Sequence, residues 1–122
     1  MHIIDSSKVE PTKLNGRHIR KIIEKGGVVE SQYMSLGMAE FSTDIGPMTP
    51  HRHDEEGIYV LEAENCYTRC GDCVENFSEP KKIEPGMFLL YGKDEWHVFE
   101  FQGKGYLKII FFFATGDLKR PE

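Results

Sequence analysis

Two histidines separated by a single residue stand beside a run of acidic residues near the middle of the chain. His51 and His53 form the pair, and Glu56 follows after Asp54 and Glu55. Residues two apart on a strand point to the same side, so we expect both imidazoles on one face of a sheet. Neutral imidazoles and a carboxylate are ligands that iron, manganese, nickel, zinc and copper prefer. The pattern indicates a divalent metal site, although a His-x-His pair near acids also occurs on exposed strands.

A third histidine stands farther along the chain, at the start of an aromatic segment. His97 follows a Pro-Gly turn at residues 85–86, a short apolar segment at 87–91 and a polar turn at 92–95. This order is typical of two strands joined by a turn. It would aim His97 back toward the side that holds the first pair.

Both segments resemble the two short motifs of the cupin superfamily, whose members are small β-barrels of jelly-roll type. The second family motif has a glycine, five residues, a proline, one residue, a glycine, two residues and a histidine. Gly86 and His97 keep that length here. Gly92 stands in the place of the proline and Asp94 in that of the second glycine, and both residue types favour turns.

The first family motif has a His-x-His pair, a glutamate three or four residues beyond it and a glycine seven positions after that glutamate. Glu56 follows His53 with one residue fewer than usual between them, and Ala63 stands where the family has glycine. The resemblance covers about residues 34–113. It implies that one divalent ion (iron, manganese, nickel or zinc) is held by four side chains: His51, His53, Glu56 and His97.

Cupins include dioxygenases, decarboxylases, isomerases, lyases, cyclases, storage proteins and sensor domains, so the resemblance implies a fold more narrowly than an activity. Three imidazoles and one carboxylate around an octahedral ion would leave two adjacent positions for a substrate or dioxygen. Three histidines alone resemble the arrangement in thiol dioxygenases. We expect a metal-dependent enzyme that acts on a small metabolite with dioxygenase, isomerase or lyase chemistry. The alternative is a small-molecule-binding or sensor module without catalysis, and no residue separates the two.

Frequent glycines and prolines divide the chain into short segments, which favours an all-β domain. The 122 residues include 12 glycines and 6 prolines, and no segment keeps a helical apolar spacing over three turns. About eight strands are expected: 18–23, 31–41, 57–62, 65–69, 81–84, 87–91, 96–101 and 105–114. This number suits a small barrel or a two-sheet sandwich. With the cupin resemblance it predicts one domain over residues 1–122, a double-stranded β-helix (jelly-roll) barrel at about 17–114 with a polar N-terminal segment and a short C-terminal tail.

The segment Ile109–Phe113 is apolar at every position, so a strand there should be covered on both faces. A second sheet or another subunit would supply the second cover. In many small cupins the N-terminal strand pairs with a second subunit, which makes residues 18–23 a candidate dimer strand. The resemblance therefore implies a homodimer.

Strand alternation predicts which side chains surround the ion. Ile58 and Val60 would share the side of Glu56, and Phe99 and Phe101 would share that of His97. A pocket built from these residues would be largely apolar with one polar end and would take a small molecule. Aromatic residues at this spacing also form ordinary core.

Three cysteines, Cys66, Cys70 and Cys73, fall within eight residues, and this cysteine segment has three interpretations. A second metal site would need a fourth ligand, from Asp72 or another subunit. A redox-active Cys70–Cys73 pair is the second interpretation, and it would suit a structural or redox-interaction protein. Free thiols on a surface hairpin are the third.

Composition excludes several classes of partner. Fifteen Lys and Arg residues against twenty Asp and Glu residues give a net charge of −5, which argues against nucleic-acid binding. No apolar run approaches the roughly 20 residues that a spanning helix needs, so no membrane partner is expected. Residues 1–5 do not resemble a secretory signal, and we expect a cytoplasmic location, where cysteines stay reduced.

Overall fold

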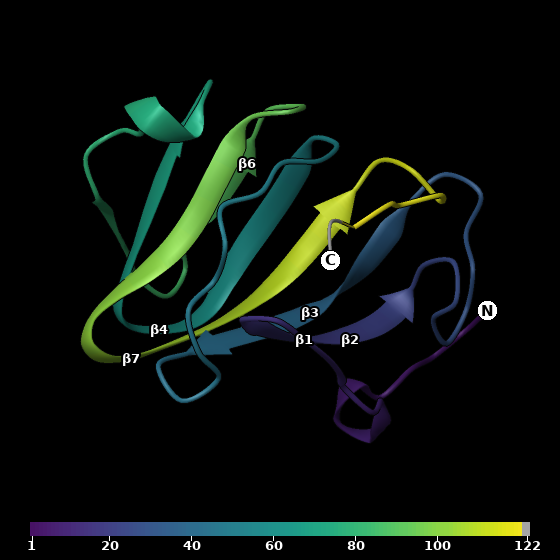
Figure 1. The fold of residues 1–122 in the computed structure, drawn as a ribbon. Coiled ribbons are helices and arrows are strands. Elements are labelled where there is room, and N and C mark those ends of the chain that lie inside the picture. Colours follow the sequence, from purple (N-terminus) through teal and green to yellow (C-terminus); the bar gives the residue numbers. More distant parts are fainter. Residues whose placement is uncertain (121–122) are drawn as a thin grey trace.

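Strands make up about half of residues 1–120, the part of the chain that the computed structural model describes (Figure 1). The strands are β1 (Thr12–Leu14), β2 (Arg17–Ile23), β3 (Ser35–Ser42), β4 (Glu56–Gly71), β5 (Lys81–Ile83), β6 (Phe88–Tyr91) and β7 (Trp96–Phe113). Two single-turn 3₁₀ helices, η1 (Ser6–Lys8) and η2 (Val74–Asn76), accompany them. The prediction of an all-β fold is confirmed. No helix within residues 1–120 is long and apolar enough to cross a membrane.

All strand pairs are antiparallel, in the order β1-β2-β3-β7-β4-β5, and β6 also pairs with β4. The two long strands, β4 and β7, pair from Glu56 opposite Phe113 to Gly71 opposite Trp96. Bulges interrupt this ladder near its middle, and a bulge bends a strand and increases its twist. Figure 1 shows that β4 and β7 both turn midway, which folds their halves around a common interior.

The middle of β7 depends on a close approach that only glycine permits. A Cβ atom on Gly105 would lie 2.7 Å from the carbonyl oxygen of Glu64 and would overlap the ring of Phe101. Gly103, two residues earlier, has a positive φ of 74°, a conformation that favours glycine. The predicted strands 96–101 and 105–114 are therefore one continuous bent strand, and the same holds for 57–62 and 65–69 in β4.

Period-two burial places the core inside this bent sheet. Burial alternates along all eight residues of β3, and Ile109, Phe111 and Phe113 of β7 are each 2% exposed. Phe112 points to the other face and is 42% exposed. The sequence predicts that other residues cover both faces of Ile109–Phe113. Within residues 1–120 the inner face is buried, whereas Phe112 on the outer face is exposed.

The role of residues 18–23 as a dimer strand stays a prediction. These residues belong to β2, which pairs with β1 on one side and with β3 on the other. The pairing with β1 covers Arg17–Ile19, and the pairing with β3 runs from His18 to Ile23.

Candidate metal centre

The predicted ligands come from three separate pieces of chain at one end of the sheet. Glu56 begins β4 and His97 is the second residue of β7, whereas His51 and His53 lie in the loop that precedes β4. The backbone of His51 forms a two-way bridge with that of His97, through hydrogen bonds of 3.1 and 2.9 Å. The loop is anchored again where Asp94 N donates to the carbonyl oxygen of His53 (2.8 Å). Backbone pairing therefore holds the loop histidines beside His97.

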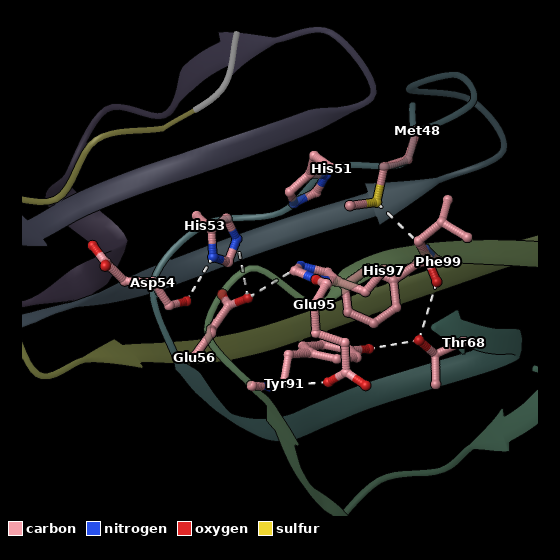
Figure 2. A network of polar contacts seen from close by, with 12 residues as sticks. Met48, His51, His53, Asp54, Glu56, Thr68, Tyr91, Glu95, His97 and Phe99 are labelled. Atoms are coloured by element: carbon pink, nitrogen blue, oxygen red, sulfur yellow. Dashed lines mark hydrogen bonds and ion pairs between the residues drawn. The ribbon is translucent and has the colours of Figure 1, made fainter. Parts of the chain in front are cut away.

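The three imidazoles converge, and their candidate ligand nitrogens lie within 4.8 Å of one another. We call His51, His53 and His97 the histidine cluster. Glu56 Oε1 lies 3.4 Å from His53 Nε2 and 3.6 Å from His97 Nε2 (Figure 2). The structure thus brings all four predicted residues together, with the carboxylate beside two of the three rings.

Backbone carbonyl groups orient each ring in the same way. The Nδ1 atoms of His51, His53 and His97 lie 3.2, 2.9 and 2.9 Å from the carbonyl oxygens of Thr49, Asp54 and Glu95. A carbonyl oxygen only accepts, so each Nδ1 must carry the proton and donate it. Each Nε2 then keeps its lone pair, and anchoring the distal ring nitrogen in this way is typical of metal-bound histidines.

One of these nitrogens is buried without a partner. Among residues 1–120, His97 Nε2 is the only buried side-chain nitrogen or oxygen that lacks a hydrogen bond. Leaving such a group unsatisfied costs roughly 1–3 kcal/mol. A divalent ion would supply the missing interaction, so this atom and the chemistry of the donor set both fit a metal site.

Burial sets the charge of the cluster. It lowers the pKa of His51 to about 4 and that of His97 to about 3, and it lowers the pKa of His53. Burial raises the pKa of Glu56 to about 8. The imidazoles are therefore neutral at physiological pH, the form that binds metals, while Glu56 without an ion keeps its proton and must lose it to become a ligand.

A second layer of contacts fixes the ring of His97. The ring of Tyr91 stacks on it in parallel, with 4.0 Å between centroids. The Tyr91 hydroxyl donates to Thr68 Oγ1 (2.5 Å), and Thr68 donates to the carbonyl oxygen of Val98 (3.0 Å). Figure 2 shows this chain of contacts beneath the imidazole. Sequence reasoning missed Tyr91 and Thr68, because in the sequence Tyr91 is simply the last residue of an apolar strand.

The histidine cluster and Glu56 lie at the polar end of a cavity of about 30 Å³. A buried water needs about 10–15 Å³ of such space, so the cavity takes only a few small groups. Apolar side chains form the rest of the wall: Ile19, Ala39, Phe41, Met48, Phe99, Ile109, Phe111 and Phe113.

The four predicted pocket residues are placed differently from one another. Phe99 lines the cavity, whereas Phe101 lines a second cavity that Phe99 also borders. Ile58 and Val60 share the inward face of Glu56 but lie in the core, 3% and 1% exposed. Their partners across the ladder in β7, Phe111 and Ile109, line the cavity instead.

The cysteine segment does not gather into a metal site. The histidine cluster is the only group of metal-ligating side chains at metal-binding spacing within residues 1–120. Cys66 is buried in the core, which raises the pKa of its thiol to about 12, Cys70 is half-buried and Cys73 is exposed. All three are free thiols. A redox link between Cys70 and Cys73 stays a prediction.

Two arginines that sequence reasoning missed also line the cavity. Arg17 begins β2 and is 8% exposed. Arg120, expected in a loose C-terminal tail, instead forms a buried two-pronged ion pair with Glu24 at 2.6 and 2.8 Å. The segment that follows β7 is tied down earlier as well, because Ser35 Oγ donates to the carbonyl oxygen of Thr115 (2.8 Å). Figure 1 shows this yellow segment turning back toward β3.

Comparisons with solved structures agree with this architecture. The polyketide cyclase RemF from Streptomyces resistomycificus superposes with a TM-score of 0.71 and 18% identity, over 98% of this chain and 82% of its own. Fe(II)-HppE with the alternative substrate (S)-1-HPP gives a TM-score of 0.69 and 15% identity, over 93% of this chain and 60% of its own. An RmlC-like cupin from Methanocaldococcus jannaschii, described as a double-stranded β-helix, gives 0.60 and 10%, over 84% of each chain.

Sequence comparison adds no relative, because no family model and no curated protein matches the chain. At identities of 10–18% the structural likenesses concern the fold. They agree with the residues of the two motifs and with the antiparallel bent sheet. The chain therefore has the cupin fold, a double-stranded β-helix with a histidine cluster at one end.

Proposed function

We propose that this protein is a metal-dependent enzyme that acts on a small metabolite. One divalent ion would be held by the Nε2 atoms of His51, His53 and His97, with the carboxylate of Glu56 as fourth ligand. The observation that carries the proposal is the common orientation of the three rings, each with Nδ1 on a backbone carbonyl and Nε2 left for an ion. The iron(II) named for HppE makes iron the first ion to test.

Several groups around the ion would contribute to the proposed catalysis. When bound, the ion would act as a Lewis acid toward a substrate oxygen or would activate dioxygen, which suits isomerase, lyase or dioxygenase chemistry. Glu56 exchanges one proton with the site as the ion enters or leaves. The apolar wall excludes water from the polar end, which strengthens electrostatic interactions there. Tyr91 and the backbone carbonyls keep the rings in place.

Elemental analysis of untagged protein, purified without added metal, tests the metal site. We expect close to one iron, manganese, nickel or zinc ion per chain, and loss of that ion in His97→Ala. His18→Ala is the matched control, because His18 lies on β2 outside the cavity. An equal metal content in wild type and His97→Ala, or no metal in wild type even after reconstitution, would refute the proposal.

Catalysis is separated from mere binding by a second measurement. Metal-loaded wild type and His97→Ala are incubated with a mixture of small metabolites and followed by NMR. Conversion of one component by wild type alone supports an enzyme. Saturable binding without any product favours the alternative, a binding or sensor module.

We further propose that the protein is a homodimer through the outer face of its sheet. On this face one row of cross-strand neighbours is Leu90, Gly57, Phe112 and Leu36, and the next is Phe88, Tyr59, Ile110 and Met38. Phe88 is 81%, Leu90 68% and Phe112 42% exposed. An apolar surface of this kind is unfavourable in water and marks a contact surface. A second copy would supply the cover that the sequence predicts for Ile109–Phe113.

Sedimentation equilibrium tests the dimer. Wild type is expected at twice the mass of the chain, and Leu90→Lys together with Phe112→Lys at the mass of one chain with its metal content unchanged. A monomeric wild type at micromolar concentration would overturn this second proposal and leave the metal site untouched.

A further inference from the structure

A second cavity, of about 320 Å³, lies against the cavity that holds the histidine cluster. Met48 and Phe99 line both cavities, so these two side chains form the partition between them. The rest of the second wall consists of Thr43, Gly46, Pro47, Glu100 and Phe101. Thr43, Pro47 and Glu100 are exposed, whereas Phe99 is buried. The second cavity therefore adjoins solvent at its rim and the metal centre at its inner end.

The two side chains of the partition differ in how firmly they are held. The ring of Phe99 packs edge-on against that of Phe41, with 4.9 Å between centroids, and Phe99 is 4% exposed. Met48 is half-buried, and its Sδ accepts a hydrogen bond of 3.4 Å from the backbone N–H of Phe99 (Figure 2). A thioether is a weak acceptor, and the unbranched methionine side chain adapts its shape easily. Met48 is therefore the movable part of the partition.

Hydrogen bonds anchor the loop that carries Met48 on both sides. Before it, Thr43 N donates to the carbonyl oxygen of Gly105 (3.1 Å), and Gly105 N donates to Thr43 Oγ1 (2.6 Å). After it, the two-way backbone bridge joins His51 to His97. A rotation of the Met48 side chain would thus join the two cavities while the loop ends and the metal ligands stay in place.

The wall of the second cavity suits an uncharged apolar group. Its inner part consists of Met48 and the rings of Phe99 and Phe101. Glu100, the one charged residue among those that line it, lies at the rim with its carboxylate 3.8 Å from Arg69 Nη1. A dry apolar cavity of roughly 150 Å³ holds one benzene molecule. The second cavity therefore has room for one ring or a short alkyl chain.

We propose that the substrate has two parts: a small oxygen-bearing head at the metal centre, and an uncharged apolar tail that displaces the Met48 side chain and lies in the second cavity. The inference rests on the proposed function, because the head would bind the ion. The cavity at the metal centre, of about 30 Å³, takes only the head. The tail would then be buried against Phe99 and Phe101, which makes Met48 and these two rings the residues that select the substrate.

Acetohydroxamate and hexanohydroxamate are matched probes, because they share a metal-chelating head and differ only in the length of the alkyl chain. Binding to protein reconstituted with zinc(II) is measured by titration calorimetry, and elemental analysis checks that zinc stays bound. We expect hexanohydroxamate to bind wild type at least about tenfold more tightly, the gain from burying roughly two methylene groups. In NMR spectra its chain protons should show nuclear Overhauser effects to Met48 and Phe101.

Two variants act on the second cavity from opposite ends. Pro47→Trp narrows it from the exposed rim, and should weaken hexanohydroxamate at least about fivefold while acetohydroxamate stays within about twofold. Met48→Ala removes the side chain that the tail displaces, and should strengthen hexanohydroxamate about threefold, the equivalent of one weak hydrogen bond.

Met87→Ala is the matched control for the methionine. The Sδ atom of Met87 also accepts a backbone N–H, from Glu84 at 3.3 Å, yet Met87 lines neither cavity. Both hydroxamates should bind this control as they bind wild type.

The outcomes separate the two proposals. Equal affinities of the two hydroxamates for zinc-loaded wild type overturn the inference and leave the metal site standing. Overhauser effects from the chain to residues outside the second cavity also overturn it, as does an equal loss for both probes in Pro47→Trp. An unchanged or lower affinity for hexanohydroxamate in Met48→Ala overturns the part assigned to Met48.

A wild type that retains neither zinc nor iron(II) refutes the proposed function instead. Hexanamide, which has the same chain without the chelating head, then tests the second cavity in the metal-free protein. Overhauser effects between its chain and Phe101 would support the tail site, and their absence would overturn it.

Discussion

The histidine cluster and the cysteine segment differ in how separation along the chain relates to distance in the folded structure. Cys66, Cys70 and Cys73 are neighbours in the sequence, yet one is buried in the core, one half-buried and one exposed. The cluster combines a loop before β4 with the start of β7, and its ligand nitrogens lie within 4.8 Å. Along one strand, residues four apart are separated by about 13 Å, whereas pairing between strands joins distant segments. Proximity in a β protein therefore follows strand pairing and not sequence spacing.

Adding the preferred ion should stabilise the folded chain through the histidine cluster and not through the cysteine segment, and this is the largest effect we expect. A ligand that binds only the folded chain, present at one hundred times its Kd, stabilises it by about 2.7 kcal/mol. Thermal or denaturant unfolding of stripped and reloaded wild type measures this gain. The gain should vanish in His97→Ala and persist in Cys70→Ser. The reverse result would move the metal site to the cysteine segment.

Replacing Glu56 should have opposite effects with and without metal. In Glu56→Gln we expect metal affinity to fall at least about tenfold, because a charged ligand is lost. The metal-free variant should be more stable than wild type at pH 8. Burial raises the pKa of Glu56 from 4.5 to about 8, so the folded chain binds a proton that the unfolded chain releases. That contribution to stability falls as pH rises from about 4.5 to 8 and then levels off.

Unfolding curves from pH 4 to 9 check this sign. Below pH 6.5 the wild type and Glu56→Gln should both lose stability, since burial lowers the pKa values of His51 and His97 to about 4 and 3 and the unfolded chain takes up protons first. A Glu56→Gln profile parallel to that of wild type between pH 5 and 8 would show that Glu56 does not titrate with a raised pKa.

Tyr91→Phe should have a smaller effect. The ring that stacks on His97 remains, and only the hydroxyl contact with Thr68 is lost, which is worth about 1 kcal/mol. Denaturant unfolding measures the loss, and metal affinity should stay within about fivefold of wild type. A larger drop in affinity with unchanged stability would assign the hydroxyl a direct part in orienting the imidazole.

Cys73→Ser should have the smallest effect of all. Cys73 is an exposed, free thiol, and surface substitutions usually change stability by less than about 0.5 kcal/mol. Metal content should be unchanged. The redox pair with Cys70 would instead be established if a thiol–disulfide buffer oxidised wild type to an internal disulfide and Cys73→Ser formed none.

Local pattern accounts for much of what could be predicted. The period-two alternation of β4 placed Ile58 and Val60 on the inward side with Glu56, and the two motifs named four residues that the structure brings together. Tyr91, Arg17 and Arg120 could not be predicted in the same way. Tyr91 contacts His97 through ring stacking, and Arg120 approaches the site because the segment after β7 folds back. Arg17 reaches the same cavity from the start of β2. No pattern of residue spacing in the sequence indicates any of these contacts.

By itself the sequence determined that the chain forms strands with period-two burial and carries imidazoles in segments of cupin type. Those features depend on neighbouring residues, through alternation along a strand and through the conformations that glycine and proline allow. Tertiary structure alone decided that three Nε2 atoms face one another, that Glu56 is buried among them and that two arginines share their cavity. These properties arise from the register of β4 against β7 and from chain folding back on itself, which bring together groups that no local rule connects.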